Sequence, residues 1–250
     1  MRGALATRVI VVALAALLLA APVTAQQTQQ LPYVIIWFLG FNTSQPPFDN
    51  VMARRAVAAS LERARLAAAD DNVLANSFEP PGCLAHNANA RPHPFNLEQA
   101  KALLTQSGIK LDELSALGLW YLSALRRGNS QAELQILSAN ISALGVEVSL
   151  REFGNYGAFE RIATLPVVKM SYWGVGAPMA VCNRESFLED LVHSRGAFNY
   201  FGYRNAEVDA LIVRAIQSGD RATKIRLYQE VEQKILDDAV IVPIWYWIVR

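Results

Sequence analysis

The stretch Phe41-Asn-Thr-Ser-Gln-Pro-Pro-Phe-Asp-Asn50 decides the fold prediction, together with the run Val51-Met-Ala-Arg-Arg-Ala-Val-Ala-Ala-Ser-Leu-Glu-Arg63 that follows it. A polar segment with two adjacent prolines ends a strand, and Asp49 or Asn50 can cap the helix that begins next. Upstream, residues 33–39 form a continuous apolar run rich in β-branched and aromatic side chains, which is typical of a buried strand. The sequence therefore predicts a strand, a loop and a helix in this order.

Strands and helices are predicted to alternate along the rest of the chain. The pattern Asn96-Leu-Glu-Gln99 has capping-box spacing, and Gly108 and Gly145 each follow a helical pattern. An alternation of this kind predicts an α/β layered domain. The expected helices span residues 51–69, 96–108, 130–144, 206–217 and 221–238, and the expected strands span residues 33–39, 146–150, 165–173 and 240–245, with a long loop over residues 72–93.

The amino terminus has the features of a cleaved secretory signal. Arg2 and Arg8 precede an apolar run over residues 9–21 and the small-residue site Val23-Thr-Ala25. We expect a signal peptide over residues 1–25, a polar spacer over residues 26–30, and a protein exported to the periplasm. Removal of the two arginines leaves 21 basic and 22 acidic residues, without a basic stripe, so nucleic acid is not an expected partner. Arg54-Arg55 and Arg126-Arg127 are expected on solvated helix faces.

Five segments together resemble one protein family. They are the loop and helix from Phe41, Ala75-Asn-Ser-Phe-Glu-Pro-Pro-Gly82, Phe95-Asn-Leu-Glu-Gln-Ala-Lys-Ala-Leu-Leu104, Tyr203-Arg-Asn-Ala-Glu-Val-Asp-Ala-Leu-Ile212 and Ala239-Val-Ile-Val-Pro-Ile244. In this order they resemble the family 5 extracellular solute-binding proteins, which deliver peptides or nickel to ABC importers. The resemblance implies a periplasmic binding protein type II-like lobe, an α/β domain whose mixed sheet is flanked by helices. It also implies a peptide or another small solute as ligand, and permease subunits in the inner membrane as partners.

The chain is about half as long as the members of this family. Residues 31–250 resemble the carboxy-terminal lobe alone, so the expectation is a truncated binding protein. The resemblance implies a ligand enclosed between two lobes; the first lobe could be a separate polypeptide. The alternative is a secreted interaction fragment or remnant that binds no ligand. In that case Trp245-Tyr-Trp-Ile-Val249 would be an unpaired, adhesive strand edge.

The resemblance also places ligand recognition on Ser171, Tyr172, Trp173 and Gly174. Family members have a strand ending in Gly-Trp along the ligand, whose backbone can pair with an extended peptide and whose aromatic rings can stack on it. The alternative for Trp173 is a core aromatic. Peptide-binding relatives usually carry an Asp three residues after this Trp, to pair with the ligand's ammonium group. This chain has Gly176 there, and Glu185 and Asp190 are displaced from it in sequence.

Cys83 and Cys182 are the only cysteines, and after export they either form a disulfide or remain free thiols. The three histidines are scattered, so no metal site is expected, and His86 and His93 are the one pair that merits a test. The chain lacks a Gly-x-Ser-x-Gly elbow, a His-Glu-x-x-His motif and a phosphate-binding loop. We therefore expect a binding protein without a cofactor, and no enzyme.

Overall fold

The computed structural model describes residues 33–111, 114, 117–122, 130–182 and 184–249. The expected signal peptide, the polar spacer and Arg126-Arg127 lie outside this part of the chain. Within the described residues, the search for an apolar helix of membrane-spanning length found none.

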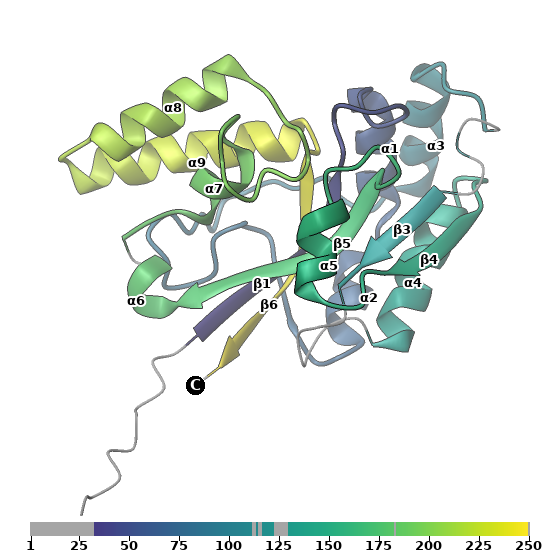
Figure 1. The fold of residues 1–250 in the computed structure, drawn as a ribbon, viewed down its shortest axis with the longest axis horizontal. Helices are drawn as coiled ribbons and strands as arrows, with labels where there is room; N and C mark the ends of the chain where they lie inside the picture. Colours follow the sequence, from purple (N-terminus) through teal and green to yellow (C-terminus); the bar gives the residue numbers. More distant parts are fainter. Residues whose placement is uncertain (1–32, 112–113, 115–116, 123–129, 183, 250) are drawn as a thin grey trace, which may run out of the picture. The chain divides into compact units, whose positions relative to one another are not determined.

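A single mixed sheet of six described strands organises the fold (Figure 1). The strand order is β2-β6-β1-β5-β3-β4. Strand β1 is antiparallel to both β5 and β6, β6 is antiparallel to β2, and β3 is parallel to β4 and β5. This confirms the predicted α/β fold with a mixed sheet flanked by helices. The strands are β1 Tyr33–Phe41, β2 Val73–Leu74, β3 Leu117–Tyr121, β4 Val148–Glu152, β5 Met170–Pro178 and β6 Ile241–Val249.

Local capping signals set the starts of several helices. The Asn50 side chain accepts a hydrogen bond from the Met52 amide (2.8 Å), so Asn50 rather than Asp49 is the first cap. Asn96 accepts one from the Gln99 amide (2.9 Å), which confirms this cap, although the Asn96 amide donates to the Ala59 carbonyl (2.8 Å). Helices α8 and α9 also match their prediction and lie side by side, next to α7 (Figure 1). The helices are α1 Val51–Ser60, α2 Arg63–Ala68, α3 Leu97–Gln106, α4 Gln131–Ser142, α5 Tyr156–Ile162, α6 Met179–Cys182, α7 Phe187–Val192, α8 Ala206–Gln217 and α9 Arg221–Asp237.

Tertiary contacts override the local pattern at two predicted elements. The single helix predicted over residues 51–69 is wrong, because the backbone is extended at Leu61 and the Glu62 amide donates to the Asn140 side chain (2.9 Å). The strand predicted over residues 165–173 is wrong in its bounds. Residues 165–169 precede β5 and include a turn, in which the Val168 amide donates to the Leu165 carbonyl (2.9 Å). The strand itself begins at Met170 and continues to Pro178.

Three further expectations about exposure and edges are corrected. Strand β4 begins two residues later than predicted and lies at the edge of the sheet, where it pairs with β3 alone, and its Leu150 is exposed. Arg54 is buried rather than solvated, because its guanidinium donates to the Phe48 and Asp238 carbonyls (2.7 and 2.8 Å). Strand β6 is not an unpaired edge at Trp245 and Tyr246, since β1 and β2 pair with these residues on opposite sides.

The core is built on both faces of β1, which is buried from Val34 to Phe41, whereas Tyr33, the first residue of the predicted buried run, is exposed. On one face Trp37 stacks on Trp245, with ring centroids 5.3 Å apart. On the other face Phe38 packs edge-on against Trp173 of β5, with centroids 4.7 Å apart. The large aromatic area buried on both sides makes β1 the central element of the domain.

Two buried carboxyl groups and a disulfide attach the loop before residue 87 to the rest of the domain. Cys83 and Cys182 are joined by a disulfide, with Cα atoms 4.9 Å apart. Glu79 accepts hydrogen bonds from the Ser186 hydroxyl and from the Phe187 amide (2.9 Å) at the start of α7. Glu232 of α9 accepts hydrogen bonds from the Ser77 hydroxyl (2.8 Å) and the Phe78 amide. These contacts connect one loop to α6, α7 and α9.

Burial favours the protonated form of both carboxyl groups. It raises the pKa of Glu79 from 4.5 to about 8; the charge of Glu232 adds to this rise, while the hydrogen bonds to Glu79 oppose it. Burial also raises the pKa of Glu232 to about 7. One oxygen of each group, Oε2 in both cases, has no hydrogen-bond partner within the described structure. A retained proton therefore avoids two unpaired buried charges.

We expect the free energy of unfolding to fall as the pH rises from about 4.5 to about 8. In this range the folded state binds more protons than the unfolded state, so the stability present below pH 4.5 is lost as the folded carboxyl groups ionise. Glu79→Gln keeps the hydrogen-bond acceptor without the ionisation, so its stability should rise relative to wild type at the alkaline end. Urea unfolding of both proteins at several pH values between 5 and 9, on the order of one unit apart, measures this.

The matched control is Glu98→Gln, which changes an exposed carboxyl group on α3. Its stability relative to wild type should not vary with pH across the same range. If the difference between Glu79→Gln and wild type were likewise independent of pH, the buried group would not retain its proton and the interpretation would be wrong.

Candidate ligand-binding site

The four residues predicted for ligand recognition divide between different environments. Alternate side chains of a strand point to opposite faces of the sheet, so Tyr172 and Trp173 of β5 are directed apart. Trp173 and Gly174 line a surface cavity, whereas Ser171 and Tyr172 do not. Ser171 is buried where β5 pairs with Gly40 of β1 and Trp120 of β3.

Tyr172 belongs to a buried polar cluster in the core. Its hydroxyl donates to the Glu133 carboxylate of α4 and accepts from the Trp245 indole (2.9 Å). Its side chain is fully buried, and burial together with the Glu133 charge raises its pKa well above the ordinary value. Because its hydroxyl is buried and bonded on both sides, Tyr172 joins α4 to the sheet and does not contact a ligand.

Trp173 combines a core position with a place at the cavity wall. Its ring packs against Phe38, Phe159 and Phe201, with centroid separations of 4.7, 4.8 and 6.1 Å, and only 2% of the residue is exposed. The same ring lines the cavity. Trp173 is therefore a fixed aromatic support rather than a mobile side chain.

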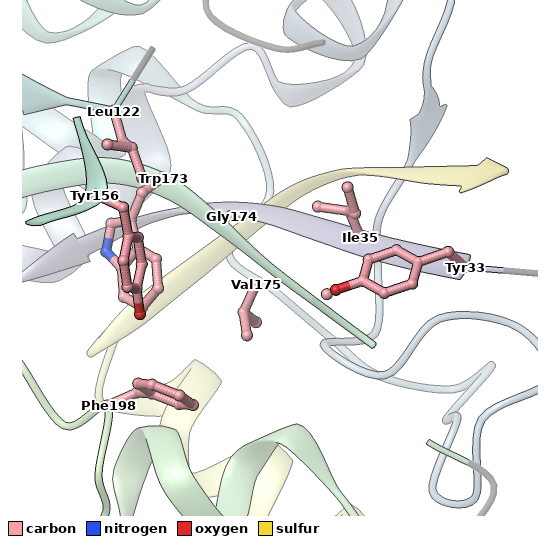
Figure 2. A pocket seen from close by; sticks show the side chains of 9 residues that line it. Tyr33, Ile35, Leu122, Tyr156, Trp173, Gly174, Val175 and Phe198 are labelled. Carbon is pink, nitrogen blue, oxygen red and sulfur yellow. The ribbon is translucent and has the colours of Figure 1, made fainter. Parts of the chain in front are cut away.

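The cavity has a volume of about 390 Å³, which is within the range of small-molecule sites. Figure 2 shows Trp173 and Tyr156 at one end and Tyr33 at the other, with Val175 of β5 between them. None of its lining residues is charged, so its walls suit apolar or aromatic groups. They are Tyr33, Ile35, Leu122, Tyr156, Trp173, Gly174, Val175, Gly176 and Phe198.

Beside this cavity one edge of β5 has no neighbour among the described strands, and we call it the open edge. The pairing with β3 ends at Tyr172, whose carbonyl accepts from the Leu122 amide (3.2 Å). Backbone groups of every second residue point to the same edge of a strand, so those of Gly174 and Gly176 follow the Tyr172 carbonyl toward this side. No described strand pairs with β5 there, although β1 covers its other edge as far as Pro178. The arrangement leaves hydrogen-bonding groups for an added strand.

Close packing against β1 explains the two glycines. A Cβ at Gly174 would lie 2.9 Å from the Trp37 indole and 3.0 Å from the Ile36 carbonyl oxygen. A Cβ at Gly176 would lie 2.6 Å from the Tyr33 ring and 2.7 Å from Ile35. The absence of side chains here lets β1 aromatics cover β5 on one face while the open edge stays accessible.

The histidines occupy separate environments. The His86 Nδ1 is 2.7 Å from the Glu79 carbonyl oxygen. His93 lines a different, open depression with Arg91 and Asp237, and burial is the main cause that lowers its pKa. In the described part of the chain, no three His, Cys, Asp or Glu side chains gather as a metal site would require.

Comparison with known proteins identifies the family. The model of the bacterial extracellular solute-binding proteins, family 5 Middle, matches residues 4–183. The chain belongs to this family.

Curated relatives agree with this assignment. The periplasmic oligopeptide-binding protein OppA of Escherichia coli is 24% identical over 229 residues, covering 87% of this chain and 40% of its own. The glutathione-binding protein GsiB of Salmonella typhimurium is 26% identical over 227 residues, with 85% and 42% covered. The chain thus spans about 40% of the length of these family 5 relatives.

Solved structures show the same fold. A dipeptide binding protein from a Pseudoalteromonas species, crystallised in complex with Met-Leu, superposes with a TM-score of 0.76 at 21% identity. The match covers 89% of this chain and 45% of that protein. The family 5 fold resemblance predicted from the sequence is therefore confirmed, and the relatives are binding proteins rather than enzymes.

Sequence reasoning missed most of the cavity wall. Tyr33 was assigned only to a buried strand, and Tyr156 and Phe198 lie in segments without a recognised element. The available signal was the aromatic content of residues 198–203 and the helix cap at Asn155, whose side chain accepts from the Ala158 amide (2.9 Å). This cap starts α5 and so places Tyr156 at the cavity.

We expect Gly174→Ala to lower the free energy of unfolding by about 1 to 3 kcal/mol, the usual cost of overpacking. The new methyl group meets the buried Trp37 ring and a backbone carbonyl, neither of which can move freely. Gly219→Ala is the matched control, because no atom lies within 4 Å of its added Cβ. Urea unfolding of both variants measures the effect. Equal stabilities would contradict the close packing of β1 over this part of β5.

Proposed function

We propose that this protein is the periplasmic substrate-binding component of an ABC importer for peptides or similar small solutes. The observation that carries the proposal is the open β5 edge at Gly174 and Gly176 beside an uncharged cavity. Residues 31–250 act as the carboxy-terminal lobe of such a protein and residues 1–25 as its signal peptide. The protein works by binding and release, without catalysis.

An extended peptide suits the open edge because its own N–H and C=O groups can continue the sheet. Such hydrogen bonds involve the backbone only, so they accept peptides of different sequence. The glycines assist, because they bring no side chain between the edge and the ligand backbone. This main-chain recognition supports a peptide over a sugar or a metal ion as the ligand.

The cavity supplies a place for one apolar side chain of the ligand. The exposed ring of Tyr156 can stack on it, Trp173 supports the same end of the cavity, and Val175 forms the wall between them and Tyr33. Because Trp173 is held by the surrounding aromatic cluster, little side-chain freedom is lost when a ligand binds. The relatives that carry oligopeptide, dipeptide and glutathione in their names are consistent with this class of ligand.

The test is the unfolding temperature with and without a library of unblocked tripeptides of uncharged residues. Ligand binding to the folded state raises this temperature by mass action, so we expect a rise for the wild type. Val175→Phe should lose most of the rise, because the larger ring fills the cavity. The matched control, Val213→Phe on the exposed face of α8, should keep it. An unfolding temperature of the wild type that does not change with the library would contradict the proposed function.

A further inference from the structure

A second, smaller cavity of about 140 Å³ lies next to the first one. The two cavities share Val175, Gly176 and Phe198 as lining residues. Gly176 is also the second residue that directs its backbone to the open edge of β5. A ligand backbone on this edge therefore passes both cavities in turn, and the smaller one can receive a side chain of its own.

The walls of the smaller cavity combine apolar side chains with two carboxylates. Most of them are apolar: Val175, Ala177, Val181, Phe187 and Phe198. The lining also includes two carboxylates, Glu185 after α6 and Asp190 on α7, and both residues are exposed to solvent. A long basic side chain has the complementary structure, because its methylene stem packs on apolar walls while its charged end stays near water.

Neither carboxylate has an ion-pair partner among the described residues. The ion pairs between described residues involve neither Glu185 nor Asp190. No lysine or arginine lines either cavity, so these two acids are the only charged side chains among the lining residues. A cation that enters the smaller cavity meets two acceptors and no competing protein base.

The wall that carries the acids is fixed from behind. The disulfide holds Cys182 at the end of α6, and the hydrogen bonds from Ser186 and Phe187 to Glu79 hold the start of α7. Cys182, Ser186 and Phe187 all line the cavity. A wall fixed in this way holds Glu185 and Asp190 in place, and a preorganised pair of carboxylates favours a cationic occupant.

We propose that the smaller cavity selects ligands with a basic side chain, whose ammonium or guanidinium group binds Glu185 and Asp190. The stem of that side chain lies on Val181 and Phe187, and the ligand backbone follows the edge at Gly176. This specificity rests on the proposed function, since it requires a peptide on β5. It assigns the charge selection to residues after β5 rather than to the strand itself.

The test compares two peptides that differ only in charge. Both are pentaalanine peptides blocked at both ends, one with lysine and one with norleucine at the centre, so the lysine carries the only cation. Titration calorimetry on the full chain should give the lysine peptide an affinity roughly ten times higher, as expected for a charge-assisted hydrogen bond. The double variant Glu185→Gln, Asp190→Asn should bind both peptides equally, with the norleucine affinity unchanged. Glu147→Gln, an exposed acid on the β3–β4 side, should keep the preference.

The other possible results of this titration contradict either the basic-side-chain site alone or the peptide-binding proposal as well. If the double variant keeps the preference, or the wild type shows none while it binds norleucine peptide, the basic-side-chain site is wrong and the peptide-binding proposal stands. If the double variant loses affinity for both peptides alike, the acids support the structure instead of selecting charge, and the site is again wrong. If the wild type binds neither peptide, the peptide-binding proposal and the selective site fail together.

Discussion

The pairing of β1 between β5 and β6 is the constraint on which the described structure depends. β1 contacts both neighbours along almost its whole length, and its side chains are buried on both faces of the sheet. Trp37 and Phe38 are adjacent in sequence, yet they anchor the aromatic clusters on opposite faces. A shift of one residue in the β1–β5 register would exchange these two faces. The same shift would remove Gly174 from Trp37, so register, core and cavity are fixed by one pairing.

This constraint also explains why the candidate site lies where β5 loses a neighbour. β1 follows β5 to Pro178, whereas the described part of β3 pairs with it only as far as Tyr172. Among the described strands, the stretch from Trp173 onward is thus supported on one side only. The pairing with β1 fixes the strand and its aromatic wall, while the other side keeps backbone groups available.

The sequence was most informative where structure is decided locally. The Asn50 and Asn96 caps and the helices α8 and α9 follow from side chains next to the elements that they start or form. The family resemblance gave the fold class. Prediction failed where a residue distant in sequence determines the local structure. The Asn140 side chain accepts a hydrogen bond from the Glu62 amide, and the predicted helix is interrupted there. Similarly, β5 begins only where β1 and β3 pair with it. The cavity also needs Tyr33, Tyr156 and Phe198, which only the tertiary fold brings together. Of the lining residues, the sequence therefore predicted only Trp173 and Gly174.

The buried Glu79 connects stability to the candidate site. A glutamine could accept the same hydrogen bonds without a proton-dependent cost, so packing alone does not require an acid at this position. Ser186 and Phe187, which donate hydrogen bonds to Glu79, also line the smaller cavity and lie between Glu185 and Asp190 in sequence. At this position Glu79 orders the backbone of the wall through its two hydrogen bonds. Because structural costs tend to gather where a protein binds its ligand, the unfavourable burial of Glu79 is itself an argument that the α6–α7 segment serves recognition.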